Sequence, residues 1–241
     1  MSMNTIADAV VAQNVQLTEA YARIHALEKQ LTATRPSATR KALTLQNLID
    51  YRPKTMGFTG QWLEAVGDPE PFGSWIIYGG SGQGKTRFTL QLTKYLMTFP
   101  GLRIAYDSLE EGVSETYRRA VIDTGLMAER TGHFKFWDRY DYGRMCEELA
   151  KKRSPNVVII DSLQYMNLGY EQYKELIARF PRKLFIWISH ESGGKPDGTT
   201  GKKVLYNSNV KIRVRNFWAD ITSRYAGKHL YDIWPEQHRN E

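Results

Sequence analysis

Residues 79–86 have the types and the spacing that hold phosphate groups. They read Gly79-Gly80-Ser81-Gly82-Gln83-Gly84-Lys85-Thr86, which is the complete pattern G-x-x-x-x-G-K-[ST]. Glycines allow backbone N–H groups to turn toward phosphate oxygens. Lys85 would place a positive charge on the β- and γ-phosphates, and the Thr86 hydroxyl would hold Mg²⁺. We therefore predict that these eight residues and Arg87 bind ATP together with Mg²⁺.

The residues on either side predict the strand, loop and helix in which such a motif works. Residues 74–78 are typical of a buried strand, and apolar side chains recur at helical spacing over residues 88–99. Pro100-Gly101 would end that helix. Two alternatives stay open. One is a glycine-rich turn with a chance lysine, and the other is a degenerate loop that binds nucleotide without hydrolysing it.

A second candidate group follows another apolar run. Residues 157–160 are Val-Val-Ile-Ile, and Asp161 comes directly after them, which matches the Walker B pattern. In an open α/β sheet, ligands bind beyond the carboxyl ends of the strands. We therefore expect Asp161 to hold Mg²⁺ through Thr86 or water. The alternative is an aspartate that only caps the next helix.

The rest of the chain alternates between short apolar runs and helical patterns. Strands are predicted at 102–106, 134–137 and 184–188, and helices at 113–126, 142–153 and 171–180. This alternation is typical of an α/β fold whose mostly parallel sheet is covered by helices on both faces. The separation of Lys85 from Asp161 (161 − 85 = 76 positions) leaves room for the strands at 102–106 and 134–137, which favours a sheet with an extra strand between the two motif strands. Residues 210–215, 219–224 and 229–233 predict antiparallel strands at the C-terminal end.

A catalytic base is not found beside Asp161, because Ser162 follows it. The expected strand at 102–106 runs into Ser108-Leu109-Glu110, which resembles the S-L-E of DnaB-like replicative helicases. The wider RecA-like group has a catalytic glutamate at this strand end. The resemblance implies that Glu110 activates the attacking water, with Glu111 as the weaker candidate. The alternative is an ordinary acidic helix start.

The resemblance to RecA-like ATPases covers roughly residues 55–235 and implies further roles. His190 follows the strand at 184–188, where RecA-like proteins carry a polar residue that senses the γ-phosphate; a plain strand-end histidine is the alternative. The glycine-rich segment 191–203 occupies the position of their second DNA-binding loop. It implies phosphate contacts by Lys195, Lys202 and Lys203, and the alternative is a solvated loop.

A basic finger completes the expected site. Residues 222–227 resemble the K-N-R-F-G segment of RadA-like ATPases, which projects into the ATP site of the neighbouring subunit. The resemblance implies that Arg224 acts in this way. Lys211, Arg213 and Arg215 are alternative fingers. One alternating strand places all three on the same face, so the other interpretation of these residues is a solvated basic face.

The N-terminal segment forms the other part of the expected domain organisation. Val10, Leu17, Ile24 and Leu31 are spaced by seven, without glycine or proline between residues 4 and 33. We predict an N-terminal helix over 1–35, which is either a coiled-coil or oligomerisation arm or one amphipathic helix packed on its own domain. The RecA-like ATPase domain would cover 36–241. We therefore expect a homo-oligomer, which is either a ring, such as a hexamer, or a filament.

The whole chain restricts the remaining choices. It has 241 residues, a formal net charge of +7 and a sequence pI of about 9.3, which favours a nucleic-acid partner such as DNA. The single cysteine, the lack of a signal-peptide pattern and the lack of a long apolar run predict a cytoplasmic protein with no membrane partner. We expect an ATPase acting on nucleic acid. A nucleotide-switched assembly factor and a small-molecule kinase are the alternatives.

Overall fold

A computed structural model describes residues 19, 23, 42–128 and 131–238, and its chain divides into two compact units, 1–52 and 53–241. Apart from residues 19 and 23, the predicted heptad helix at residues 4–33 lies outside the described residues. In the first unit, the short helix α2 (Leu45–Asp50) begins after Thr44, whose side chain accepts a hydrogen bond from the Asn47 backbone N–H. The second unit contains the sheet and all the other helices named below.

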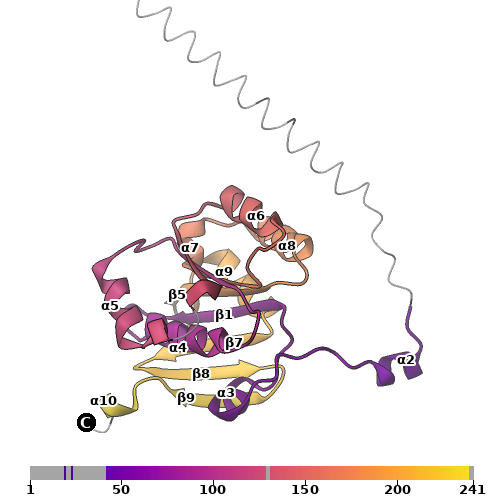
Figure 1. The fold of residues 1–241 in the computed structure, drawn as a ribbon, viewed down its shortest axis with the longest axis horizontal. Coiled ribbons are helices and arrows are strands. Elements are labelled where there is room, and N and C mark those ends of the chain that lie inside the picture. Colours follow the sequence, from indigo (N-terminus) through magenta and orange to yellow (C-terminus); the bar gives the residue numbers. More distant parts are fainter. Residues whose placement is uncertain (1–18, 20–22, 24–41, 129–130, 239–241) are drawn as a thin grey trace, which may run out of the picture. The chain divides into compact units, whose positions relative to one another are not determined.

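The second unit is built on a sheet of nine strands among the described residues (Figure 1). The strands are β1 (Gly73–Gly79), β2 (Ile104–Ser108), β3 (Phe134–Asp138), β4 (Val157–Asp161), β5 (Leu184–Ser192), β6 (Lys195–Pro196), β7 (Val210–Arg215), β8 (Trp218–Ser223) and β9 (Gly227–Asp232). Their order is β3-β2-β4-β5-β1-β7-β8-β9, and β6 pairs with β5. The pairs from β3 to β7 are parallel, and β7, β8 and β9 pair antiparallel.

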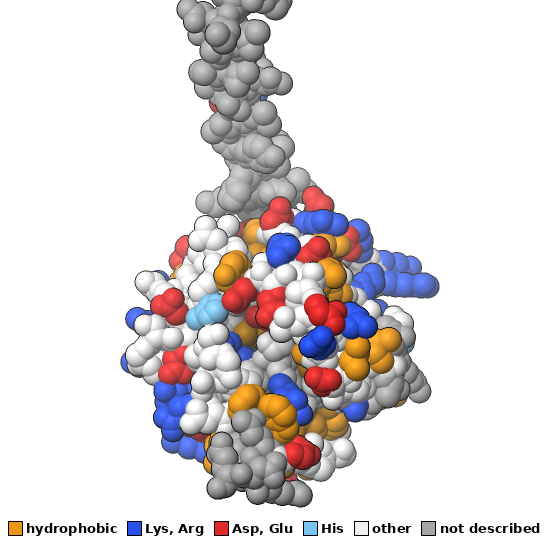
Figure 2. Space-filling view, turned by 90° about the vertical axis from the view of Figure 1, so that its left-hand side faces the viewer, with side chains coloured by type: hydrophobic (Ala, Val, Ile, Leu, Met, Phe, Trp, Pro, Cys, Tyr) orange, Lys and Arg blue, Asp and Glu red, His pale blue; other side chains and the backbone are white. Residues whose placement is uncertain are grey.

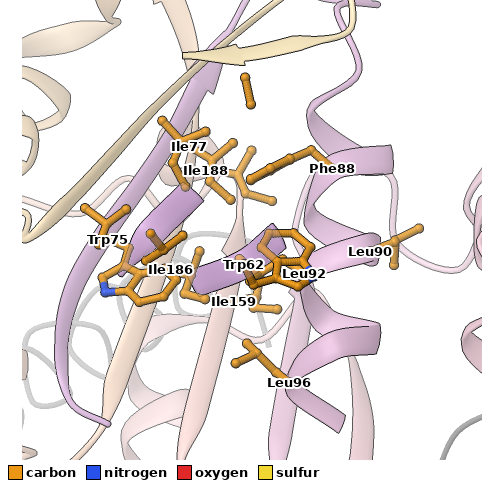
Figure 3. Close-up of a cluster of buried hydrophobic side chains, with 14 of the residues drawn as sticks. Trp62, Trp75, Ile77, Phe88, Leu90, Leu92, Leu96, Ile159, Ile186 and Ile188 are labelled. Carbon is orange, nitrogen blue, oxygen red and sulfur yellow. The ribbon is translucent and has the colours of Figure 1, made fainter. Parts of the chain in front are cut away.

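Helices cover both faces of this sheet because its central strands are apolar on both sides. On β1, Trp75 and Ile77 face one core cluster while Ile76 faces the other, as the alternation of side chains along a strand requires. The first cluster packs against α3 (Gly60–Val66), α4 (Lys85–Met97) and α5 (Glu115–Asp123). Figure 3 shows part of it, with Trp62 of α3 and Phe88 of α4 beside the strand residues.

The second cluster packs against four helices on the opposite face: α6 (Tyr142–Ala150), α7 (Leu163–Met166), α8 (Tyr170–Arg179) and α9 (Gly198–Asn207). A last short helix, α10 (Pro235–His238), follows β9. The predicted fold class is therefore confirmed, with a mostly parallel sheet, helices on both faces and antiparallel strands at the C-terminal end. No helix in the described ranges is long and apolar enough to span a membrane.

The expected extra strand between the two motif strands is present, and it is β5. The order places β5 between β1, which leads into the phosphate-binding motif, and β4, which ends at Asp161. β2 and β3, which lie between those motifs in the sequence, are beyond β4 in the sheet. The extra strand predicted from the sequence is therefore confirmed, but the strands at 102–106 and 134–137, on which that prediction rested, are not the inserted ones.

One structural expectation was wrong. Residues 191–203 are an ordered hairpin and helix, and not a long loop: β5 continues to Ser192, β6 pairs back onto it, and α9 begins at Gly198. Gly193 and Gly194 make the turn with positive φ angles of 59° and 77°, which glycine adopts without strain. The Asp197 side chain accepts a hydrogen bond from the Gly198 backbone N–H at 2.8 Å and caps the helix.

Candidate nucleotide-binding site

The phosphate-binding motif lies at the carboxyl end of β1, in the turn that leads into α4. Gly82 and Gly84 have positive φ angles of 71° and 103°. A Cβ atom on Gly84 would lie 2.7 Å from the Phe217 ring, and one on Gly79 would lie 2.2 Å from the Val214 carbonyl oxygen. Both contacts are too short for a side chain, so glycine is required where the turn passes β7 and the residues after it. The backbone of the motif can therefore approach a phosphate group closely.

Lys85 begins α4 and points back into the motif. Its Nζ donates hydrogen bonds to the carbonyl oxygens of Gly79 at 2.9 Å and Gly80 at 2.7 Å. Burial lowers the pKa of Lys85, while the carboxylates of Asp161 and Glu110 oppose that shift. The neighbouring Thr86 is half-buried. The lysine is therefore held at the centre of the turn, within the electrostatic reach of two carboxylates.

Asp161 ends β4 at the same edge of the sheet and is half-buried. The Tyr106 hydroxyl donates a hydrogen bond to its Oδ2 at 2.5 Å. Burial raises the pKa of Asp161 to about 6; Glu110 adds to this rise, whereas the Tyr106 hydrogen bond and Lys85 oppose it. A carboxylate beside a phosphate-binding turn has the oxygen chemistry that Mg²⁺ prefers. The Tyr106 contact is one that the sequence did not indicate.

The same aspartate also anchors Glu110. The Asp161 carbonyl oxygen accepts the backbone N–H groups of Leu109 at 2.6 Å and Glu110 at 3.2 Å. Ser108 lies opposite Asp161 in the pairing of β2 with β4, so the two strands deliver both carboxylates to one edge. Glu111 turns elsewhere, because its Oε2 accepts the hydroxyl of Ser114 at 3.0 Å. This geometry favours Glu110 over Glu111.

His190 lies beside Glu110. Its Nε2 is 3.1 Å from Glu110 Oε2, and its backbone N–H donates to Gln164 Oε1 at 3.2 Å. Pairing of β5 with β1 places His190 opposite Gly79. Figure 2 shows the molecule from the left-hand side of Figure 1, with acidic side chains (red) and basic side chains (blue) on the face toward the viewer. The structure thus brings Lys85, Asp161, Glu110 and His190 together.

A cavity of about 520 Å³ adjoins the motif. It lies between α4, α5 and the C-terminal residues, and its aromatic walls are Phe217 and Trp234. Their rings are 5.2 Å apart and edge-to-face, and the Arg87 guanidinium carbon is 4.0 Å from the centre of the Trp234 ring. Neither aromatic residue was predicted from the sequence, because each is more than a hundred positions from the motif.

Gln83 joins the motif to the same C-terminal residues. Its side-chain oxygen accepts the backbone N–H of Asn216 at 2.7 Å, and its carbonyl oxygen accepts that of Phe217 at 3.1 Å. Asn216 and Phe217 have positive φ angles of 48° and 58° and form the tight turn between β7 and β8. The Gln83 side chain therefore fixes the cavity wall, which was not its predicted role.

The candidate fingers differ in their distance from the motif of their own chain: Lys211, Arg213 and Arg215 lie on β7 beside β1, and Arg224 lies away from it. Ser223, next to Arg224, pairs with Val210 at the start of β7, so Arg224 lies at the edge of the sheet opposite the phosphate-binding turn. Arg213 is engaged within the chain, where its guanidinium donates to both Glu191 oxygens at 2.6 and 3.1 Å. This ion pair leaves Arg213 a poorer candidate than the exposed Arg224.

The three predicted nucleic-acid residues, here called the hairpin–helix lysines (Lys195, Lys202 and Lys203), are all exposed. Lys195 lies in β6, and the other two lie in α9. The Lys203 Nζ is 4.5 Å from the centre of the Tyr170 ring, and Tyr206 is 68% exposed on the same helix. The segment begins close to the carboxylate site, since the Asp197 backbone N–H donates to the His190 carbonyl oxygen at 2.8 Å.

The residues present fit a magnesium–nucleotide complex better than a metal held by protein alone. Glycines leave the turn open, Lys85 supplies a positive charge, and Thr86 and Asp161 supply oxygen ligands. In the part of the chain that the structure describes, no group of three or more histidine, cysteine, aspartate or glutamate side chains could hold a metal ion. Phosphate oxygens and water would have to complete such a magnesium site.

Comparison with solved structures supports the fold. The chain is similar to a KaiC-like protein of the hyperthermophilic archaeon Pyrococcus horikoshii OT3, with 16% identity, a TM-score of 0.53, and 75% of this chain and 99% of that chain covered. It is also similar to the flagellar accessory protein FlaH of Methanocaldococcus jannaschii, with 13% identity, a TM-score of 0.53, and 75% and 94% covered. No protein-family model and no curated protein matches the sequence. The likeness shows the predicted RecA-like fold.

Proposed function

We propose that this chain is a Mg²⁺-dependent ATPase that acts on nucleic acid as a homo-oligomer. The observation that carries the proposal is the convergence of Lys85, Asp161 and Glu110 at one edge of the sheet. Because the Asp161 carbonyl oxygen accepts the backbone N–H of Glu110, the aspartate and the glutamate are held as one unit. A phosphate bound by the turn would face both carboxylates.

Each group has a distinct part in the proposed hydrolysis. Lys85 and the backbone N–H groups of residues 79–87 would neutralise the phosphates and stabilise the charge that develops during transfer. Bound Mg²⁺ would supply further positive charge on the β- and γ-phosphates, held by Thr86 and Asp161. Glu110 would accept a proton from the attacking water. His190 would orient Glu110 through their 3.1 Å contact.

The cavity beside the motif would take the nucleobase. A volume of about 520 Å³ is in the range of small-molecule sites. Trp234 and Phe217 offer apolar ring faces and edges, and Arg87 lies over Trp234. Residues of both α4 and α5 line the cavity, so the base would lie between these two helices.

The nucleic-acid surface would be formed by the hairpin–helix lysines with the exposed Tyr206, beside the half-buried Tyr170. Exposed lysines can contact phosphates, and exposed aromatic rings can stack on unpaired bases. The Asp197–His190 hydrogen bond joins this segment to the carboxylate site, so that binding and hydrolysis can affect each other. Single-stranded DNA is the partner that this combination of basic and aromatic side chains fits best.

The oligomer would supply the missing finger. Arg224 is exposed and lies on the edge opposite the turn of its own chain, so it can approach only the motif of another copy. Head-to-tail contacts of that kind generate either a ring or a helical filament.

The test is ATP turnover with and without single-stranded DNA. We expect the wild-type chain to hydrolyse ATP faster when DNA is present. Lys85→Ala should reduce turnover by orders of magnitude, because it removes charge from the phosphates. Glu110→Gln should reduce turnover by about 10²–10⁴ while nucleotide binding is retained. Glu111→Gln is the matched control and should leave turnover nearly unchanged.

Two results would refute this proposal. Wild-type turnover in the Lys85→Ala variant would rule out the phosphate-binding assignment. A wild-type chain that binds ATP but turns it over no faster than Glu110→Gln would instead be the nucleotide-switched assembly factor that the sequence leaves open.

A further inference from the structure

Positively charged side chains gather at the edge of the sheet that lies opposite the nucleotide site. Ile104 of β2, Val157 of β4 and Leu184 of β5 lie side by side in the pairing of these parallel strands. The residues that precede the three strands therefore meet at the amino-end edge. Five basic residues gather there, and we call them the basic edge: Arg103, Lys152, Arg153, Arg182 and Lys183.

Two of these cations are held in place by neutral groups. The Lys183 Nζ donates to the Ser154 hydroxyl at 2.8 Å and to the Pro155 carbonyl oxygen at 2.6 Å. From the other side of β4, the Arg103 Nε donates to the Ser154 carbonyl oxygen at 3.1 Å. Both charged groups thus converge on the turn before β4. Their positions are fixed before any ligand arrives, which reduces the entropy lost on binding.

The basic edge has no acidic counterpart in the described parts of the chain. None of its five members forms an ion pair with a described carboxylate, whereas the neighbouring Lys151 pairs with Glu148. Burial, and then the charges of Arg103 and Arg182, lower the pKa of Lys183 to about 8. Cations that repel one another in this way attract a polyanion.

We propose that the basic edge binds the phosphate backbone of nucleic acid, as a second contact surface separate from the hairpin–helix lysines. Three adjacent strands span about 10 Å at a spacing of about 4.8 Å. Cations spread over that distance can contact more than one phosphate of the same nucleic-acid strand. A row of cations of this length fits a polymer better than a single small anion.

This surface extends beyond the proposed ATPase and does not depend on it. A strand bound there would leave the phosphate-binding turn uncovered, because the turn lies at the opposite edge of the sheet. The same chain could then hold nucleic acid at both edges. Nucleotide is not needed for binding at the basic edge, so the surface can be tested without ATP.

The variant for the test is Arg153→Gln with Arg182→Gln in the full chain. Both side chains are exposed and make no described hydrogen bond, so the fold should be unchanged, which a circular-dichroism melt checks. The matched control is Lys54→Gln with Arg118→Gln, an equal loss of charge at exposed positions elsewhere. The probe is a fluorescein-labelled oligo-dT of about 30 nucleotides, and fluorescence anisotropy is read over a range of salt.

We expect the basic-edge variant to bind the oligonucleotide more weakly than wild type at low salt. The slope of log K against log salt should fall by about 1.4 in magnitude, since each lost single-strand phosphate contact removes about 0.7. The control variant should keep the wild-type slope. Substituting the hairpin–helix lysines as well should lower the slope further, because the two surfaces lie at opposite edges.

Two outcomes would overturn the proposal: an unchanged slope in the basic-edge variant, and an equal fall in the control variant. An unchanged slope together with a smaller assembly by analytical ultracentrifugation would make the basic edge a contact between copies. If only the hairpin–helix lysines change the slope, the basic edge fails while the proposed function stands.

Discussion

Asp107 should make the stability of this fold depend on pH near neutrality. It lies in β2, fully buried, and its Oδ1 accepts the backbone N–H of Tyr140 at 3.0 Å. Its Oδ2 has no hydrogen-bond partner among the described residues. Burial raises the pKa of Asp107 from 3.8 to about 7; Asp138 and Asp141 add to the rise, whereas the Tyr140 hydrogen bond and Arg144 oppose it.

The direction of the effect follows from proton binding. Between the unfolded pKa and the folded pKa, the folded chain keeps the proton on Asp107 while the unfolded chain has released it. Stability is therefore fully present below the unfolded pKa and is lost as the pH rises through the folded pKa. With a folded pKa of about 7 and an unfolded pKa of 3.8, the loss between about pH 5 and about pH 8 is about 2–3 kcal/mol.

Asp107→Asn isolates this contribution. The amide is nearly isosteric with the neutral acid and keeps an oxygen for the Tyr140 N–H. Relative to wild type, the free energy of unfolding of the variant should rise by about 2–3 kcal/mol from about pH 5 to about pH 8. For a chain of this size, that gain corresponds to roughly 5–10 °C in the unfolding midpoint. The measurement is urea and thermal unfolding, followed by circular dichroism.

Asp123→Asn is the matched control, because it removes the same charge from an exposed position at the end of α5, and Asp123 is not among the charges that shift the pKa of Asp107. Its stability relative to wild type should not vary over that pH range. The reasoning fails if Asp107→Asn and wild type keep a constant difference in unfolding free energy, or if the variant loses stability relative to wild type as the pH rises.

Three further expectations concern ligands and assembly. Alanine at all three hairpin–helix lysines should reduce the salt slope of DNA binding by about 0.7–0.9 for each lost phosphate contact, and an unchanged slope would place the DNA elsewhere. Trp234→Ala should weaken ATP binding by roughly 3- to 10-fold through lost ring contacts while leaving inorganic triphosphate binding unaffected; equal losses for both ligands would rule out the base pocket. Arg224→Ala and Lys85→Ala chains should each be inactive, since a trans finger contributes about 10³–10⁵ in rate. Mixing the two variants should recover part of the activity. A mixture that co-assembles and stays inactive would rule out a finger that acts in the neighbouring subunit.

The features that could be predicted from the sequence are those that a short stretch of chain completes by itself. The turn at 79–86 needs glycines, a lysine and a threonine at fixed spacing, and these residues are contiguous. Asp161 was placed by the apolar run before it, because a buried parallel strand must end at the edge where ligands bind. Glu110 was selected by its resemblance to a known strand end. The structure positions all these residues at one edge.

The hairpin at 193–194 shows where local reasoning failed. Its glycines and lysines predicted a loop, since such residues are frequent in loops. The ordered result comes from distant partners. Gly201 packs against Pro196, and Val204 is buried in the core beneath α9. Burial of that one apolar face stabilises a helix that its own composition does not favour.

What the sequence by itself determined is the chemistry of the phosphate-binding turn and the class of fold. Both depend on neighbouring residues: the first on spacing within eight positions, the second on the alternation of apolar runs with helical patterns. Tertiary structure alone decided that Tyr106 donates to Asp161, that His190 meets Glu110, and that the basic edge forms opposite the turn. These contacts join strands far apart in the chain, and strand order and register are set by packing of the whole core, which short-range patterns do not encode.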